Sequence, residues 1–480
     1  MTHGFQSGAV FNTDISYPAI IAYELGWLDR YRYPRYLGYG GLPLNMELLL
    51  RQLETKFGST FSPWEIALAL FAARGFMDRV EDYWERGPGG RPPMTSAYNH
   101  ALAVYGWDLR DALSQTFETC AARITTPKDD LINQIVQNNN DRAAMSVYPH
   151  WSDETKAMSL FDAAAELGAE PDASSECGIE TLIVFLGANN ALKCVTQLQV
   201  RWSGENYQDL REKEEYTVWR PDHFRHELAE IVAAIKTIKA RHVILCAVPH
   251  VTIPPITRGI GRKVAEKSPY FPYYTRPWIK ESEFDPHEDK NITGQEAFAV
   301  DMAIDLYNEA IERAVLDARQ GVDGTARDWY LLDTAGLLDR MAARRYIEDA
   351  NARPPWWTPY PLPPQLKSLA PPIDSRFLTG HGQGGRASGG LFSLDGVHPT
   401  TVCYGILAQE TINIMRLAGV QFASPTGHAR PDPVTVDFDR LLLLDSLVQR
   451  PPQTITPTLD VLRWGDEKLD WVKRTLTHAL

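Results

Sequence analysis

The segment from Phe224 to Val248, FRHELAEIVAAIKTIKARHVILCAV, decides the fold class of this chain. Its first part places apolar residues on one helical face, namely Phe224, Leu228, Ile231, Val232, Ile235 and Ile238. The part from His242 to Val248 is a short apolar run, which is typical of a strand buried on both faces of a sheet. The segment therefore predicts an amphipathic helix followed by a buried strand.

The same pattern recurs elsewhere in the chain. A helical apolar face between Val300 and Ala318 precedes the run Trp329 to Leu332. Two further apolar runs, Ala101 to Tyr105 and Thr181 to Leu186, each end at a glycine and are interpreted as buried strands. Strands without alternation, separated by amphipathic helices, predict an α/β fold whose parallel sheet is covered by helices on both faces.

One large domain with insertions fits this pattern better than several domains. The segment between the last predicted strand and residue 393 is rich in Pro, aromatic residues and Gly, as loops beside an α/β ligand face are. The predicted ranges are 1–420 for the α/β domain, about 30–95, 250–295 and 350–392 for its insertions, and 421–480 for a C-terminal appendage with a final helix near Glu467 to Leu480.

Composition narrows the classes of partner. The net charge of −13 disfavours a nucleic-acid-binding or anionic-membrane surface, because such surfaces need clustered Lys and Arg. No uncharged run approaches the roughly 20 residues that cross a bilayer. The cysteines lie far apart, mostly in apolar runs, and no metal-type spacing exists, so free buried thiols are predicted at Cys120, Cys177, Cys194, Cys246 and Cys403.

The segment Ser393-Leu394-Asp395-Gly396-Val397-His398-Pro399-Thr400 carries most of the chemistry. An Asp three residues before a His, ahead of a helix that ends near Gly419, lets one carboxylate orient one imidazole on a rigid element. Asp395 and His398 are therefore candidate catalytic residues. One alternative is an Asx-turn at Asp395 with His398 as a helix cap. Another is a metal site formed with His381, which no paired ligand spacing supports.

Two predicted strands end in groups that can donate hydrogen bonds to an oxyanion. In Leu186-Gly187-Ala188-Asn189-Asn190, the Asn189 side-chain amide lies at the carboxyl end of a strand, where open α/β sheets bind ligands. The backbone N–H of Gly106 follows the other strand. The alternative for both glycine segments is an ordinary turn. His250, which also follows a strand, is interpreted either as a packing residue or as part of the wall of the site.

Together these blocks resemble the SGNH, or GDSL-type, serine esterases and lipases. Asp395 and His398 match the family's Asp-x-x-His block, Gly187 and Asn189 match its Gly-x-Asn block, and Gly106 matches its Ala-Val-x-Gly strand end. The order and placement of the blocks agree over nearly the whole predicted α/β domain. The resemblance implies a three-layer flavodoxin-like fold with the strand order 2-1-3-4-5. It also implies cleavage of small-molecule or lipid carboxylic esters without a cofactor or metal.

The resemblance also assigns roles. His398 would act as general base and acid, and Asp395 would hold its tautomer. Gly106 N–H, the Asn189 amide and the serine's own N–H would form the oxyanion hole. One departure is Asn190, which stands where the family usually has Asp.

The main departure concerns the nucleophile. The family's serine lies in a Gly-Asp-Ser block after the first strand, and a segment like Ser16-Tyr17-Pro18-Ala19-Ile20-Ile21-Ala22 follows it. We therefore expect the serine and the first strand just upstream of Met1, and we expect the 480-residue chain alone to be inactive and poorly folded. Ser7, Ser16 and Ser393 are the nearest other serines. Turn and N-cap roles are predicted for the first two, and Ser393 lies too close to Asp395.

Two other possibilities remain open at this point. The chain is either a non-catalytic binding protein on the same fold or an inactive, N-terminally truncated product. The first residues show no signal-peptide pattern, which favours the cytoplasm, whereas an upstream signal peptide would direct secretion. The sequence predicts no oligomeric state.

Overall fold

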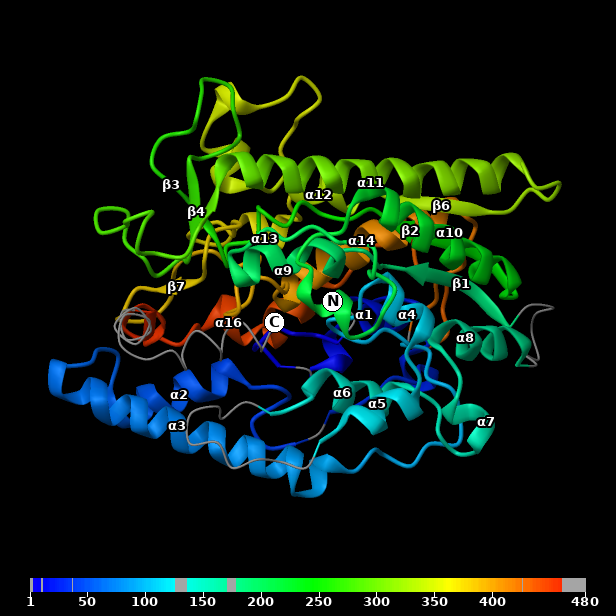
Figure 1. Cartoon of the computed structure of the whole chain (residues 1–480), viewed down its shortest axis with the longest axis horizontal. Coiled ribbons are helices and arrows are strands. Elements are labelled where there is room, and N and C mark those ends of the chain that lie inside the picture. The colour runs from blue at the N-terminus through cyan, green and yellow to red at the C-terminus, as the bar shows by residue number, and fades with distance from the viewer. Residues whose placement is uncertain are drawn as a thin grey trace.

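The predicted sheet is present as a three-stranded parallel sheet, which lies beneath α11 (Gly294–Gln320) in Figure 1. In the computed structural model, which describes residues 3–9, 12–36, 38–125, 136–170, 178–424 and 426–459, its order is β1 (Ile179–Val184), β2 (Ala240–Cys246) and β6 (Trp329–Leu332). Thr181 lies opposite His242, and Val243 lies opposite Trp329. Three of the predicted strands are thus confirmed, as is their parallel arrangement.

Helices cover both faces of this sheet. Val243 and Leu245 of β2 pack against α9 (Asn189–Gln197), α10 (Pro221–Thr237) and α11. Ile244 and Cys246, which point to the opposite face, pack against α1 (Tyr17–Glu24) and α14 (Thr401–Leu417). Because successive β2 side chains enter two different apolar clusters, the run from His242 to Val248 has no polar alternation.

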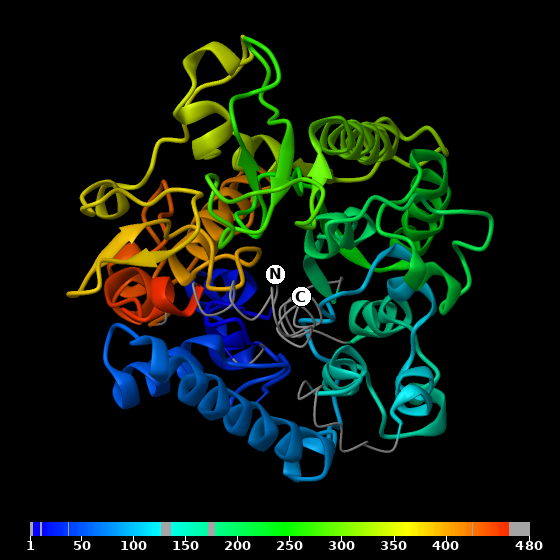
Figure 2. The same cartoon turned by 60° about the vertical axis from the view of Figure 1, so that its left-hand side comes forward.

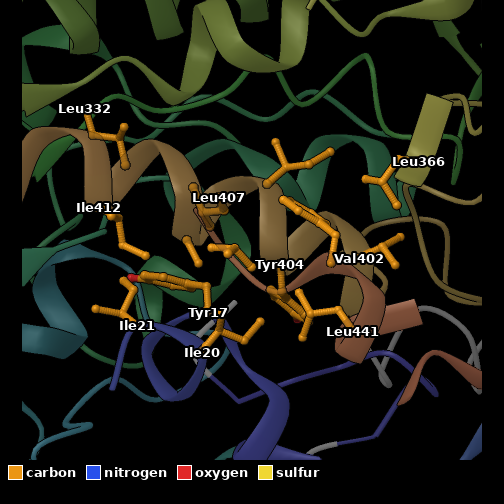
Figure 3. Packing of buried hydrophobic residues seen from close by; sticks show 14 of the residues in the cluster. Tyr17, Ile20, Ile21, Leu332, Leu366, Val402, Tyr404, Leu407, Ile412 and Leu441 are labelled. Atoms are coloured by element: carbon orange, nitrogen blue, oxygen red, sulfur yellow. The ribbon is translucent and has the colours of Figure 1, made fainter. Parts of the chain in front are cut away.

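The second of these clusters joins the two ends of the described chain. Figure 3 shows Tyr17, Ile20 and Ile21 of α1 lying against Tyr404 and Leu407 of α14. Helix α15 (Phe438–Leu444) adds Leu441 to the same cluster, followed by the short α16 (Ser446–Gln449). Much of the described segment from residue 426 to 448 therefore packs on the core that α1 and α14 share.

The remaining elements surround the sheet. The helices are α2 (Met46–Phe57), α3 (Pro63–Glu85), α4 (Leu109–Ser114), α5 (Phe117–Arg123), α6 (Asn139–Val147), α7 (Asp153–Lys156), α8 (Leu160–Ala169), α12 (Thr334–Asp339) and α13 (Pro364–Lys367). The residues 250–295 carry the antiparallel sheet β3 (Arg258–Ile260), β4 (Tyr273–Thr275) and β5 (Ile292–Thr293). Residues 350–392 carry the antiparallel pair β7 (Thr379–Gly380) and β8 (Arg386–Ser388).

The predicted strand from Ala101 to Tyr105 is wrong, because these residues form no regular ladder. A strand needs a neighbour whose N–H and C=O groups it can pair with, and within the described residues the outer edge of β1 pairs with no strand. Side chains of β1 are half-buried or exposed, whereas β2 is buried from His242 onward. The described sheet thus stops at β1, and the order β1-β2-β6 corresponds only to the 3-4-5 part of the expected five-stranded order.

Two further predictions concern helices and thiols. No helix in the described ranges is both long and apolar enough to cross a membrane. Cys120, Cys194 and Cys246 are buried free thiols, and Cys403 is free and half-buried. Cys177 and the final helix predicted near residues 467–480 lie outside the described residues.

Candidate functional site

Asp395 and His398 form a buried hydrogen-bonded pair. His398 Nδ1 lies 2.8 Å from Asp395 Oδ2, and the two residues are 8% and 4% exposed. The other carboxylate oxygen accepts hydrogen bonds from the backbone N–H groups of Val397 (2.8 Å) and His398 (2.9 Å) and from the Ser393 hydroxyl (2.9 Å). Because the carboxylate fixes Nδ1, the Nε2 atom is left for other chemistry.

The electrostatics keep this carboxyl group ionised. Burial alone would raise the pKa of Asp395, but the charge of His398 and the hydrogen bonds from His398 and Val397 lower it below its ordinary value. The Asx-turn that the sequence offered as an alternative is present, since Asp395 accepts from the Val397 N–H. His398 does not cap the following helix, however, because the N-cap of α14 is Thr400, whose hydroxyl accepts from the Cys403 N–H.

A tight turn presents the pair. The Ser393 N–H donates to the His398 carbonyl at 2.7 Å, which closes the turn between the two residues. Gly396 has φ +68°, and a Cβ at this position would lie 2.8 Å from the backbone nitrogen of Ile256. The same Ile256 N–H donates to the Gly396 carbonyl at 3.0 Å. Only glycine therefore fits this turn without strain.

The N-terminal segment lies directly against the imidazole. The ring of Phe5 stacks on that of His398, with 3.9 Å between centroids and 14° between planes. The Phe5 N–H donates to the hydroxyl of Tyr404 on α14 at 2.9 Å, and the Phe5 ring meets Tyr105 edge-on. Figures 1 and 2 show this dark blue segment near the centre of the molecule. Phe5 thus separates His398 from the residue that precedes Gly106.

A second histidine belongs to this segment. His3 is 1% exposed, and its Nε2 hydrogen-bonds to the Ala103 carbonyl. Burial lowers the pKa of His3 to about 3, and the charge of His398 contributes to the lowering. His3 is therefore neutral, with the proton on Nε2 because the carbonyl must accept it. Sequence reasoning missed His3, Phe5 and Tyr404, since no spacing rule connects them with His398.

The structure brings the two predicted oxyanion segments together. The Asn189 side-chain Nδ2 donates to the Trp107 carbonyl at 2.8 Å, so the residue after Gly106 is held against the start of α9. One of the two amide protons of Asn189 is used in this contact, and the other remains for a ligand. Gly106 has φ +77°, and a Cβ there would clash with the Asn140 side chain.

Asn190 makes a contact that an aspartate could also make. This side chain is fully buried, and its Oδ1 accepts from the Leu109 N–H at 3.3 Å, a role that an Asp oxygen also fills. Its Nδ2 has no hydrogen-bond partner among the described residues. The start of α4 is further fixed by Lys213, whose buried ammonium lies 2.8 Å from both Asp108 and Asp111.

The candidate serines point elsewhere. Ser7 Oγ donates to Glu47 at 3.1 Å, and Ser16 Oγ donates to the Thr13 carbonyl at 2.8 Å. Ser16 does occupy the N-cap position of α1, although its hydroxyl does not bond to that helix. Ser393 Oγ donates a hydrogen bond to Asp395. Within the described part of the chain, no hydroxyl is hydrogen-bonded to His398 Nε2.

The alternative metal site does not assemble. His381 does not gather with Asp395 and His398; the potential ligand cluster among the described residues is His226, Glu227 and Glu230 on α10. There Arg110 forms an ion pair with the buried Glu227 and so occupies that carboxylate.

His250 lies in a buried network of carboxylates. Its Nε2 is 3.0 Å from Asp305 and its Nδ1 is 3.5 Å from Asp339. Burial lowers the pKa of His250 and Arg345 opposes its charge, but Asp301 and the two hydrogen-bonded carboxylates outweigh them and raise the pKa to about 10. His250 thus lies in a structural network of charged side chains, which agrees with its interpretation as a packing residue.

Comparison with known proteins adds no family to this geometry. No protein-family model matches the sequence, and neither a curated protein nor a solved structure matches the chain.

Proposed function

We propose that His398 is the general base and acid, and Asp395 the carboxylate that orients it, in an ester-cleaving serine hydrolase whose nucleophilic serine comes from outside the 480 residues. The observation that carries the proposal is the buried 2.8 Å contact between Asp395 Oδ2 and His398 Nδ1. It leaves Nε2 without a hydrogen-bond partner among the described residues, as a general base requires.

The chemistry follows from this orientation. His398 Nε2 takes the serine proton as the hydroxyl oxygen attacks the ester carbonyl, and it then returns the proton to the leaving alcohol. Water hydrolyses the resulting acyl-enzyme by the same two proton transfers. Asp395 stabilises the imidazolium that forms at each step. The N–H of Gly106 and the free amide proton of Asn189 would donate to the oxyanion, where losing one donor costs roughly 100- to 1,000-fold in rate.

The outer edge of β1 pairs with no strand among the described residues, which supports the proposal of a further strand there. In the order 2-1-3-4-5, that strand lies between β1 and the segment from Ala101 to Tyr105. The segment from Ala101 to Tyr105 forms no strand, but its Leu102 and Val104 share an apolar cluster with Leu186, which follows β1. Residues 3–5 continue from this region to His398. A strand added along β1 would bring its carboxyl end toward the imidazole.

The experiment extends the protein through any in-frame codons upstream of Met1 and treats it with a serine-reactive fluorophosphonate. We expect labelling that His398→Ala abolishes, while Ser7→Ala and Ser16→Ala leave it unchanged. An in-frame stop codon directly upstream of the Met1 codon would contradict the proposal.

A binding protein on the same framework is the second candidate. The observation that favours it is that the described residues offer His398 no nucleophile. An extended protein that folds but stays unlabelled would establish this candidate and refute the hydrolase.

A further inference from the structure

A pocket of about 350 Å³ lies between the β3–β4–β5 insertion and the loops around residues 342–348 and 375–379. The labelled elements β3, β4 and β7 lie on one side of the molecule in Figure 1. Apolar side chains form much of its wall, including Ile253, Phe271 and Phe377. A pocket of this size with mostly apolar walls and a few polar groups is typical of small-molecule sites.

Four arginines line this pocket in a protein that is acidic overall. Two of them are neutralised. Arg345 lies 2.5 Å from Asp301, and Arg376 lies 2.8 Å from Glu348. The pocket therefore owes its excess positive charge to the other two arginines.

Arg258 and Arg344 have no carboxylate within ion-pair distance among the described residues. Arg344 lies over the ring of Phe271, 4.9 Å from its centroid, and makes no hydrogen bond in the described ranges. Arg258 donates one bond from Nη2 to the Ile279 carbonyl at 2.5 Å, and its buried Nε has no partner there. Burial lowers the pKa of Arg258, and the charge of Arg344 lowers it further, whereas Glu281 raises it. The two guanidinium groups therefore repel each other.

An unpaired hydroxyl lies in the wall of this pocket. Thr257 is 3% exposed and lines the pocket, yet its hydroxyl has no hydrogen-bond partner among the described residues. Buried polar groups in proteins are normally satisfied, and unsatisfied ones call for an unplaced partner. Two guanidinium groups without a carboxylate partner in one pocket call for an anion with several acceptor oxygens.

We propose that this pocket binds a small organic anion, with a carboxylate or phosphate head on an apolar body. The head accepts hydrogen bonds from the guanidinium groups of Arg258 and Arg344, because planar guanidinium groups match the geometry of both anions. The body packs against Phe271 and Phe377. This site is separate from the Asp395–His398 pair and does not depend on ester hydrolysis.

The test is calorimetric titration of the 480-residue protein with octanoate, octyl phosphate and uncharged octanol. We expect at least one anion to bind and octanol to bind at least about 10-fold more weakly, since a hydrogen bond to a charged group is lost. The anion that binds more tightly identifies the head group.

Variants separate this site from general apolar binding. Arg258→Gln and Arg344→Gln should each weaken the anion about 10-fold or more, whereas Arg376→Gln, whose charge Glu348 already compensates, should change it less than about 3-fold. Arg344→Gln removes no hydrogen bond of the described structure, so misfolding would not explain its effect. The proposal is overturned if neither anion binds, if octanol binds as tightly, or if Arg258→Gln and Arg344→Gln both bind like the original protein.

Discussion

Replacing Asp395 by alanine tests whether the Asp395–His398 turn is a rigid element. The substitution removes the acceptor of four hydrogen bonds, two of them from the backbone N–H groups of Val397 and His398. A buried donor left without a partner costs about 1–3 kcal/mol. The Ser393 hydroxyl and the imidazole can reorient, but the two backbone groups cannot. We therefore expect Asp395→Ala to lower the free energy of unfolding by about 2–5 kcal/mol.

Asp395→Asn is the matched control. Its amide oxygen still accepts from both backbone N–H groups, so we expect a loss of only about 1 kcal/mol. Its NH2 group would face His398 Nδ1 and force the proton onto Nε2, which disables the base. Urea denaturation followed by tryptophan fluorescence measures both variants. The reasoning is refuted if Asp395→Ala unfolds like the original protein, or if the two variants lose equal stability.

Three further predictions concern His250, Phe5 and Gly396. The pKa of His250 is raised to about 10, above its unfolded value of about 6.5. The protonated side chain therefore contributes its whole stabilisation below about pH 6.5, and this contribution is lost as the pH rises toward 10. His250→Gln should flatten that decline when the free energy of unfolding is measured against pH. Phe5→Ala should cost about 3–5 kcal/mol by the same assay, because the ring is fully buried against His398, and a loss below 1 kcal/mol would contradict this packing. Gly396→Ala should lower the melting temperature more than Gly419→Ala, since both have positive φ but only a Cβ at Gly396 meets neighbouring atoms; equal shifts would show that the turn has room.

Local sequence patterns predicted the elements whose formation depends on residues that are close together in the sequence. The helix and strand between Phe224 and Val248 were predicted because helical spacing and apolar runs are properties of a single segment. The run from Ala101 to Tyr105 was equally apolar, but a strand also needs a paired neighbour, and sequence periodicity does not report pairing.

In the candidate site, too, contacts within one segment could be predicted from the sequence, whereas contacts between distant segments could not. Asp395 and His398 are three residues apart, so their hydrogen bond follows from one turn and could be predicted. The sequence predicted that the segments of Gly106 and Asn189 belong to one site, but it did not predict the hydrogen bond from Asn189 to the Trp107 carbonyl. The stacking of Phe5 on His398 joins residues at opposite ends of the chain, and only the packing of α1 against α14 brings them together.

The outer edge of β1, which pairs with no strand among the described residues, also bears on how this polypeptide meets other molecules. An uncovered strand edge is a template on which a strand from another molecule can pair, and long uncovered edges promote aggregation. A short apolar peptide supplied separately would dock there by strand addition. The edge of β1 is thus the place where fragment reconstitution would add a separately supplied strand to the described sheet.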